Sequence, residues 1–222
     1  MTLILVLLMF GTLILIDYLR TRHAVPKVAL EAGALPLRTA PYGEFVDGFR
    51  VPATVRYHAG HGWAQRERSR LMRVGVDEFG AALLGNISHI EMPKPGRWVR
   101  QGQKVWSFSR NGEKTEMVSP VEGEIVEVNP EVVKDPSLLR KDPFGQGWLM
   151  TVHVPDEENV QRNFLPVHLV KAWVRDCAER LFAKQPQLAG PVIANSGQPI
   201  ADFASGLQKT NWRELTQEFF LQ

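Results

Sequence analysis

Residues 1–19, with the sequence MTLILVLLMFGTLILIDYL, limit most strongly what this 222-residue chain can fold into. No charged side chain occurs before Asp17. As a helix this segment would be about 28 Å long at about 1.5 Å per residue, which nearly matches a hydrocarbon core of about 30 Å. The run is apolar on all sides, which disfavours a core helix with one apolar stripe. We therefore expect a transmembrane helix over residues 1–19.

The residues after this segment predict its orientation. A cleaved signal peptide is the main alternative, but it would carry basic residues before the apolar run and a small-residue cleavage site after it. Here the basic residues follow the run. By the positive-inside rule we expect a single-pass membrane protein with most of the chain in the cytoplasm. The lipid bilayer is then one partner, contacted by Leu3, Leu7, Phe10, Leu13, Ile16, Tyr18, Arg20 and Arg22.

Charge and motifs exclude several classes of function. The net charge is only +2, from 26 basic and 24 acidic residues, so we expect no nucleic-acid partner. The single cysteine, Cys177, permits neither an intrachain disulfide nor a cysteine-based zinc site. His58 and His61 are too few ligands for a metal site. Without a nucleotide-binding loop or a hydrolase serine motif, we expect no catalytic residues and no enzyme.

The spacing of apolar residues divides the remaining chain into three parts. Residues 20–54 are rich in proline and glycine, which is typical of a linker. Residues 55–155 contain short alternating runs that predict strands, interrupted by one helix with Asp77 as its N-cap and Gly85 as its stop. Residues 156–222 are helical in pattern, with a break at Pro166. The fold class is thus mainly β, a sandwich-barrel with an N-terminal transmembrane helix and C-terminal helices.

The C-terminal part has two expected apolar stripes. The first is formed by Leu165, Leu169, Trp173, Cys177 and Leu181, four residues apart. The second belongs to a short final helix and must be buried somewhere. It can pack on the chain's own domain or dock on another subunit of a complex, and the residues concerned are Trp212, Leu215, Phe219 and Phe220.

The stretch SFSRNGEKTEMVSP, residues 107–120, predicts a tight β-hairpin. Two strand-like runs flank Asn111 and Gly112, and Asn-Gly favours a two-residue type I′ turn because both positions need positive φ. The nearest lysine, Lys114, follows two residues later.

Two further stretches have a distinctive pattern: YHAGHGWA, with His61 and Trp63 in a His-x-Trp arrangement, and DPFGQGWL, residues 142–149. Together with the hairpin, and in the same order, they resemble the His-x-Trp signature, the hairpin and the closing segment of the glycine cleavage system H-protein. The resemblance covers residues 55–155 and implies a lipoyl or biotinyl carrier-like β domain. In that family, a lysine on the hairpin is amidated with lipoic acid.

Counting back without a gap from Pro120 places the family's lysine at Gly112, which has no amine. The resemblance therefore implies a domain that keeps the scaffold and binds no cofactor. We expect a non-catalytic, membrane-anchored scaffold or docking subunit of a larger membrane protein complex. The alternative is a membrane-tethered carrier with lipoate on Lys114.

Overall fold

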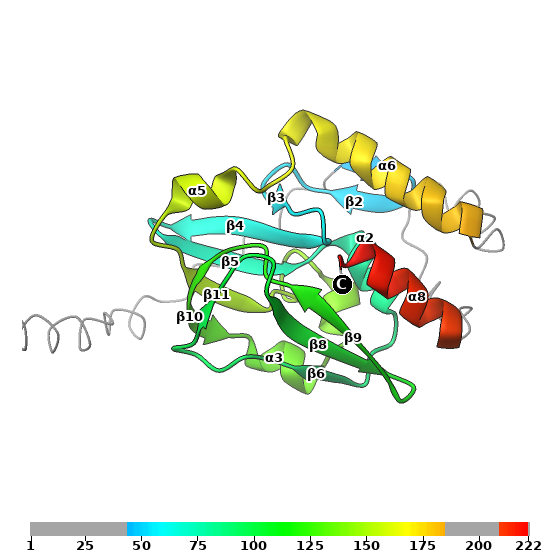
Figure 1. Ribbon diagram of the computed structural model, residues 1–222, viewed down its shortest axis with the longest axis horizontal. Coiled ribbons are helices and arrows are strands. Elements are labelled where there is room, and N and C mark those ends of the chain that lie inside the picture. Colours follow the sequence, from blue (N-terminus) through cyan, green and yellow to red (C-terminus); the bar gives the residue numbers. More distant parts are fainter. Residues whose placement is uncertain (1–43, 185–208, 222) are drawn as a thin grey trace, which may run out of the picture. The chain divides into compact units, whose positions relative to one another are not determined.

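The computed structural model describes residues 44–184 and 209–221 (Figure 1). The expected anchor over residues 1–19 lies outside these ranges, as do residues 20–43 of the expected linker. Among the helices that are described, none combines the length and the apolar character needed to cross a membrane.

Most of the strands belong to two antiparallel sheets, as expected for a mainly β fold. The larger sheet has six strands in the order β3-β4-β5-β11-β10-β7, and the smaller has three in the order β6-β8-β9. In the six-stranded sheet the strands are β3 (Arg56–Tyr57), β4 (Gly62–Arg68), β5 (Leu71–Val76), β11 (Met150–His153), β10 (Gly123–Val128) and β7 (Trp98–Val99). In the three-stranded sheet they are β6 (His89–Glu91), β8 (Lys104–Arg110) and β9 (Glu113–Val118).

A tryptophan and a glycine on neighbouring strands show how the larger sheet is packed. Trp63 on β4 is fully buried and lies opposite Gly75 on β5. A Cβ atom at Gly75 would come within 2.7 Å of the Trp63 ring, so the ring needs a glycine there. The indole Nε1 donates to the carbonyls of Val76 and Pro143, at 2.9 and 3.1 Å. The tryptophan of the His-x-Trp motif is therefore a core residue.

The helix expected after β5 is α2 (Glu78–Leu84), and the predicted N-cap and C-terminal stop are confirmed. The Asp77 carboxylate accepts a hydrogen bond of 2.7 Å from the Gly80 N–H. Gly85 ends the helix with a φ of 68°.

The closing segment DPFGQGWL follows two short helices, α3 (Pro130–Lys134) and α4 (Leu138–Lys141), and its Asp142 carboxylate accepts a hydrogen bond from the Gln146 N–H. This turn is held by its own contacts, in keeping with a structural role.

Residues 44–51, which the sequence assigns to a linker, form a hairpin of β1 (Glu44–Val46) and β2 (Phe49–Val51). Val46, Phe49 and Val51 are buried. On β2, the Arg50 Nε donates to Glu78 on α2 at 3.0 Å. The folded body thus begins at least eleven residues before the expected boundary at residue 55.

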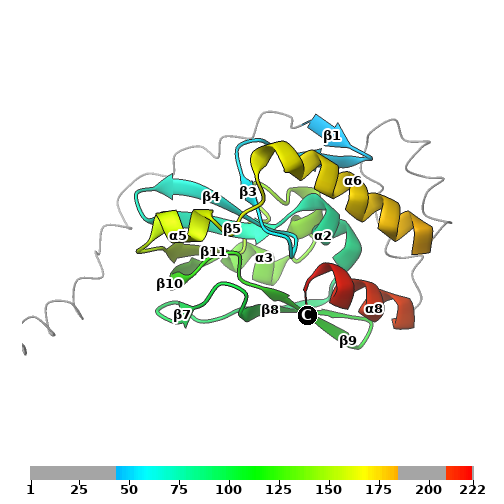
Figure 2. The same ribbon diagram turned by 45° about the horizontal axis from the view of Figure 1, so that its top comes forward.

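The helical region after residue 155 is broken at Pro166, as expected, with one helix before the proline and one after it. Asp156 caps α5 (Glu157–Gln161), and α6 (Val167–Lys184) begins directly after the proline. Helix α6 contacts β1 and β2 (Figure 2). The expected stripe is wrong at Leu169, which is 47% exposed. The residues that α6 buries are Val170, Val174, Cys177, Ala178 and Leu181.

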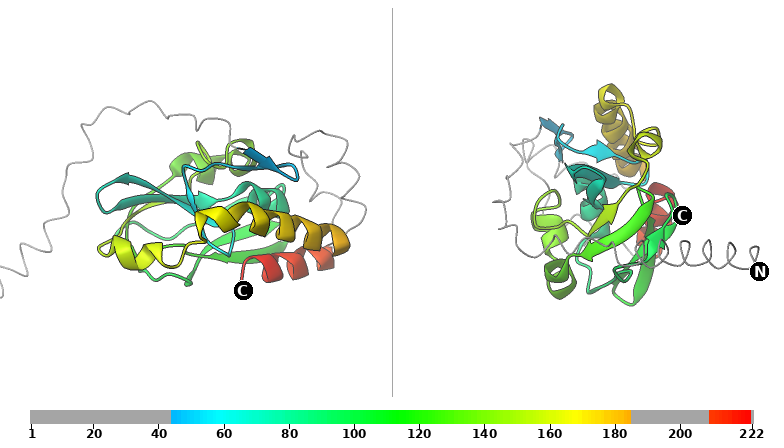
Figure 3. Two further views of the ribbon diagram at one scale, coloured as in Figure 1. Left: turned by 90° about the horizontal axis from the view of Figure 1, so that it is seen from above. Right: turned by 90° about the vertical axis from the view of Figure 1, so that its left-hand side faces the viewer.

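The last helix, α8 (Lys209–Phe219), packs on α2 and β9 of the same chain. Figure 3 shows it side by side with α6. An exposed ion pair between Lys184 and Glu218 joins the two helices, and the Arg180 guanidinium lies 4.9 Å from the Phe219 ring centroid. Helix α8 is therefore part of the folded body.

Candidate functional site at the β8–β9 hairpin

The β8–β9 hairpin carries the position at which a carrier would hold its prosthetic group. Arg110 pairs with Glu113, so the loop has only two residues, Asn111 and Gly112. Their φ values are 49° and 82°, and a type I′ turn requires positive φ at both positions. The sequence prediction of this turn is confirmed. A Cβ atom at Gly112 would meet no atom within 4 Å, so the tip is open to solvent.

Lys114 lies on strand β9 and not in the turn. Its Nζ is 2.6 Å from Oε2 of Glu91 on β6, which holds the side chain along the sheet. The two side chains are 50% and 54% exposed. The hydrogen bond from Lys114 lowers the pKa of Glu91, because it favours the charged carboxylate. The acidic partner of Lys114 in the structure is thus a residue of a different strand, Glu91.

Helix α8 contacts the hairpin directly before the turn, at Arg110, a contact that the sequence does not predict. The Trp212 ring lies under the Arg110 guanidinium, with 5.6 Å between the guanidinium carbon and the ring centroid. The indole Nε1 donates to the Leu83 carbonyl on α2 at 2.9 Å. One side chain of α8 therefore joins the strand before the turn to helix α2.

The four residues of the apolar stripe on α8 are buried in this chain's own core. Trp212, Leu215, Phe219 and Phe220 are at most 3% exposed. The Phe219 ring centroid lies 5.1 Å from that of Phe79 on α2. Of the two possibilities that the sequence left open, the structure has the intramolecular one, because α8 packs on α2 and β9 of the same chain. These side chains are not an exposed docking surface.

His61 is enclosed where α2, α6 and α8 meet. Its Nδ1 lies 2.9 Å from the Asp77 carboxylate, and its ring stacks on those of Phe79 and Trp173 at centroid distances of 4.4 and 4.6 Å. The side chain has no exposed surface, which leaves no access for a substrate. Among the described residues there is no group of three or more side chains suited to hold a metal ion. The hydrogen bond and ring contacts of His61 are those of a packed core residue.

Comparison with known proteins assigns the domain to a family. The glycine cleavage H-protein family matches residues 55–173, more than half of the chain. A glycine cleavage system H protein from Thermobifida fusca is 36% identical over 107 residues, which is 48% of this chain and 84% of the relative. One from Streptomyces coelicolor is also 36% identical, over 48% of this chain and 85% of the relative.

This chain belongs to the glycine cleavage H-protein family. A crystal structure of the H protein from Mycobacterium marinum is 28% identical and covers 47% of this chain and 87% of that one, with a TM-score of 0.44. The family match ends at Trp173 on α6, beyond the expected domain boundary at residue 155. The β1–β2 hairpin precedes the match, and the second half of α6 and the whole of α8 follow it.

Proposed function

We propose that this chain is a non-catalytic scaffold or docking subunit of a larger membrane complex, built on an H-protein domain that no longer carries a lipoyl group. One observation carries the proposal. The hairpin tip consists of Asn111 and Gly112 in a closed two-residue turn, and neither residue has a primary amine.

The geometry around Lys114 argues against a carrier that uses this lysine instead. A swinging arm needs an attachment point that projects from the tip, so that a ligase can reach it and the arm can visit partners. Lys114 instead pairs with Ser109 in the β-ladder, two residues from the tip along β9. Its ion pair with Glu91 directs the ammonium group across the sheet face. Moving Lys114 to the tip would require a register shift of the whole hairpin.

Membrane attachment is the second part of the proposal. It is supported by the length and apolar character of residues 1–19 and by the basic residues that follow. An N-terminal anchor suits a subunit that is held at a membrane while its folded body contacts partners.

A lipoylation assay with restored and blocked lysines tests the loss of the carrier site. The wild-type chain, Gly112→Lys and Lys114→Arg are incubated with a lipoate–protein ligase, ATP and lipoate, and intact masses are measured. We expect no modification of the wild type or of Lys114→Arg, and lipoylation of Gly112→Lys. A lysine fits at this position because the space around a Cβ atom is empty, although its positive φ costs roughly 1–2 kcal/mol.

Two results would decide against the proposal or limit it. Lipoylation of the wild type that disappears in Lys114→Arg would assign the carrier role to Lys114. If Gly112→Lys folds normally and still stays unmodified, the tip of this domain would differ from a carrier in more than the missing amine. The structural argument for a simple loss of the attachment site would then fail.

A further inference from the structure

The first turn of α6 exposes apolar side chains to solvent. Residues 166–169 are all exposed, and Val167 and Leu169 keep 55% and 47% of their surface. Val167 is the most exposed large apolar side chain of the described residues. Leu165, just before the helix, is half-buried. Single exposed apolar residues are common on protein surfaces, but several on one turn indicate a surface that something else covers.

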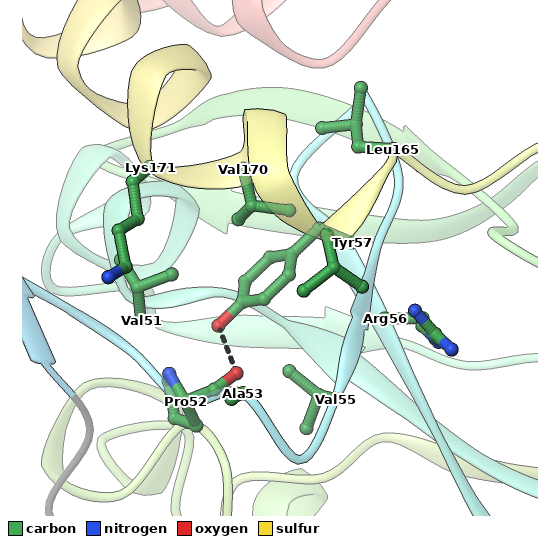
Figure 4. A pocket seen from close by; sticks show the side chains of 10 residues that line it. Val51, Pro52, Ala53, Val55, Arg56, Tyr57, Leu165, Val170 and Lys171 are labelled. Atoms are coloured by element: carbon green, nitrogen blue, oxygen red, sulfur yellow. Dashed lines mark hydrogen bonds between the residues drawn. The ribbon is translucent and has the colours of Figure 1, made fainter.

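Two exposed arginines flank this turn. Arg56 lines the small pocket beneath it, together with Leu165 and Val167. Figure 4 shows Arg56 on the same side of that pocket as Leu165. Arg162 ends α5 and lies just before Leu165 in the chain. Within the described residues, neither arginine forms an ion pair with an acidic side chain.

Acidic side chains do not counter these two cations on α6. From Arg162 to Arg175 the chain has no aspartate and no glutamate. Two acidic residues of β1 reach the helix, and each already pairs with a cation, Glu44 with Lys171 and Asp47 with Arg175. The exposed apolar turn therefore lies next to two uncompensated positive charges. This combination is complementary to an anionic lipid surface.

The chain enters the described body beside the same turn. Strand β1 is its first element, and Figure 2 shows β1 next to α6. The ion pair of Glu44 with Lys171 joins the two elements one turn after Val167. Of the described surface, the region around the start of α6 therefore contains the residues that follow the expected anchor most directly along the chain.

We propose that the first turn of α6 docks on the surface of the lipid bilayer, with Val167 and Leu169 among the headgroups and Arg56 and Arg162 at anionic lipids. Helical surfaces bind such interfaces through the apolar area that they bury and through attraction to anionic lipids. The inference rests on the membrane attachment proposed above and adds a second contact, which sets the orientation of the body. It does not depend on the state of the hairpin tip.

Methyl NMR spectra of the full chain in nanodiscs test this contact. The discs contain phosphatidylcholine alone or phosphatidylcholine with phosphatidylglycerol, and some lipids carry a gadolinium chelate on the headgroup. We expect the Val167 and Leu169 methyl signals to broaden, more strongly in the anionic discs. Val133 on α3 is the control, because it is 40% exposed and Figure 1 shows α3 on the side away from α6. Its signal should stay sharp.

Charge variants test the role of the two arginines. Each arginine near an anionic surface favours contact by about fivefold, so Arg56→Gln combined with Arg162→Gln should lower the ratio of docked to free body by about 25-fold. The matched control is Lys134→Gln combined with Lys141→Gln, because these lysines are exposed and lie on α3 and α4. The control should broaden like wild type.

Three results would overturn the proposal: sharp Val167 and Leu169 signals in anionic discs, broadening no greater than that of Val133, or equal broadening of the arginine variant and wild type. Protection of the two methyl groups in native membranes but not in discs would also overturn it and assign the turn to a protein partner. A chain that does not enter the discs would contradict the proposed membrane attachment as well. A chain that enters them with sharp signals contradicts the docking contact alone.

Discussion

Lys114 on β9 and Glu91 on β6 pair across the intervening strand β8, with 2.6 Å between Nζ and Oε2. The lysine nearest to the hairpin tip is therefore engaged on the face of the sheet. Because both side chains are about half exposed, the pair contributes little to stability. We expect Lys114→Ala to change the free energy of unfolding by less than about 0.5 kcal/mol.

The turn itself should be far more sensitive than Lys114. Gly112 has a φ of 82°, where a β-branched side chain is strained. We predict that Gly112→Val lowers the free energy of unfolding by about 1 kcal/mol or more, measured by urea denaturation. Lys114→Ala is the control, since it lies on the same hairpin. Equal stabilities of the two variants would argue against the type I′ turn.

Loss of the aromatic residues of α8 should destabilise the folded domain itself. Phe219 and Phe220 are at most 2% exposed and contact the region of His61 and Phe79. We predict that each change to alanine costs about 3–5 kcal/mol. Glu214→Ala, on the exposed face of the same helix, should stay within about 0.5 kcal/mol. If both alanine variants changed the free energy of unfolding only slightly but abolished complex assembly, the two phenylalanines would belong to a partner interface instead.

Cys177 should be chemically inert in the folded protein. It is 2% exposed, and burial raises the pKa of its thiol to about 12. At pH 8 the reactive thiolate is then much rarer than for an ordinary cysteine. We expect alkylation by iodoacetamide to be slow in buffer and rapid in denaturant, followed by mass spectrometry. Rapid labelling of the folded chain would show that α6 does not cover this residue.

His58 should make the domain sensitive to acid. Burial, and secondly the charge of His61, lowers the pKa of His58, and its Nδ1 accepts a hydrogen bond of 3.1 Å from the Gly60 N–H. The unfolded chain binds this proton more tightly, near pH 6.5. The stability present above that pH is therefore lost as the pH falls. We predict a shallower decline in the free energy of unfolding between about pH 7 and 5 for His58→Gln than for wild type. His168→Gln, an exposed control, should behave like wild type.

Local patterns were sufficient for much of this fold. Asp77 and Gly85 bound α2 as expected, and the Asn-Gly pair forms the predicted turn. The β1–β2 hairpin was not predicted, because strands of three residues are too short to show a period. The error at Leu169 has a geometric cause. Residues four apart in sequence are rotated by about 40° relative to each other around a helix. The five residues of the expected stripe therefore cannot all lie on one face.

The contacts of the site depended on distant parts of the chain. Trp212 reaches Leu83 across 129 residues, and nothing local to either residue indicates this bond. The apolar stripe of α8 showed that the helix must be buried, but its amphipathic pattern is the same for an intramolecular groove and for a partner. Glu91 was likewise not identifiable as the partner of Lys114, because two strands and a turn separate them.

The intact mass of the chain purified from its own cells tests the central claim most directly. Membranes are solubilised, the full chain is isolated, and its mass is compared with that of the sequence and with the sequence plus one lipoyl group. The account predicts the unmodified mass, because the hairpin tip offers no amine and Lys114 lies on the sheet. A lipoyl increment that peptide sequencing places on Lys114 would contradict it and establish a membrane-tethered carrier.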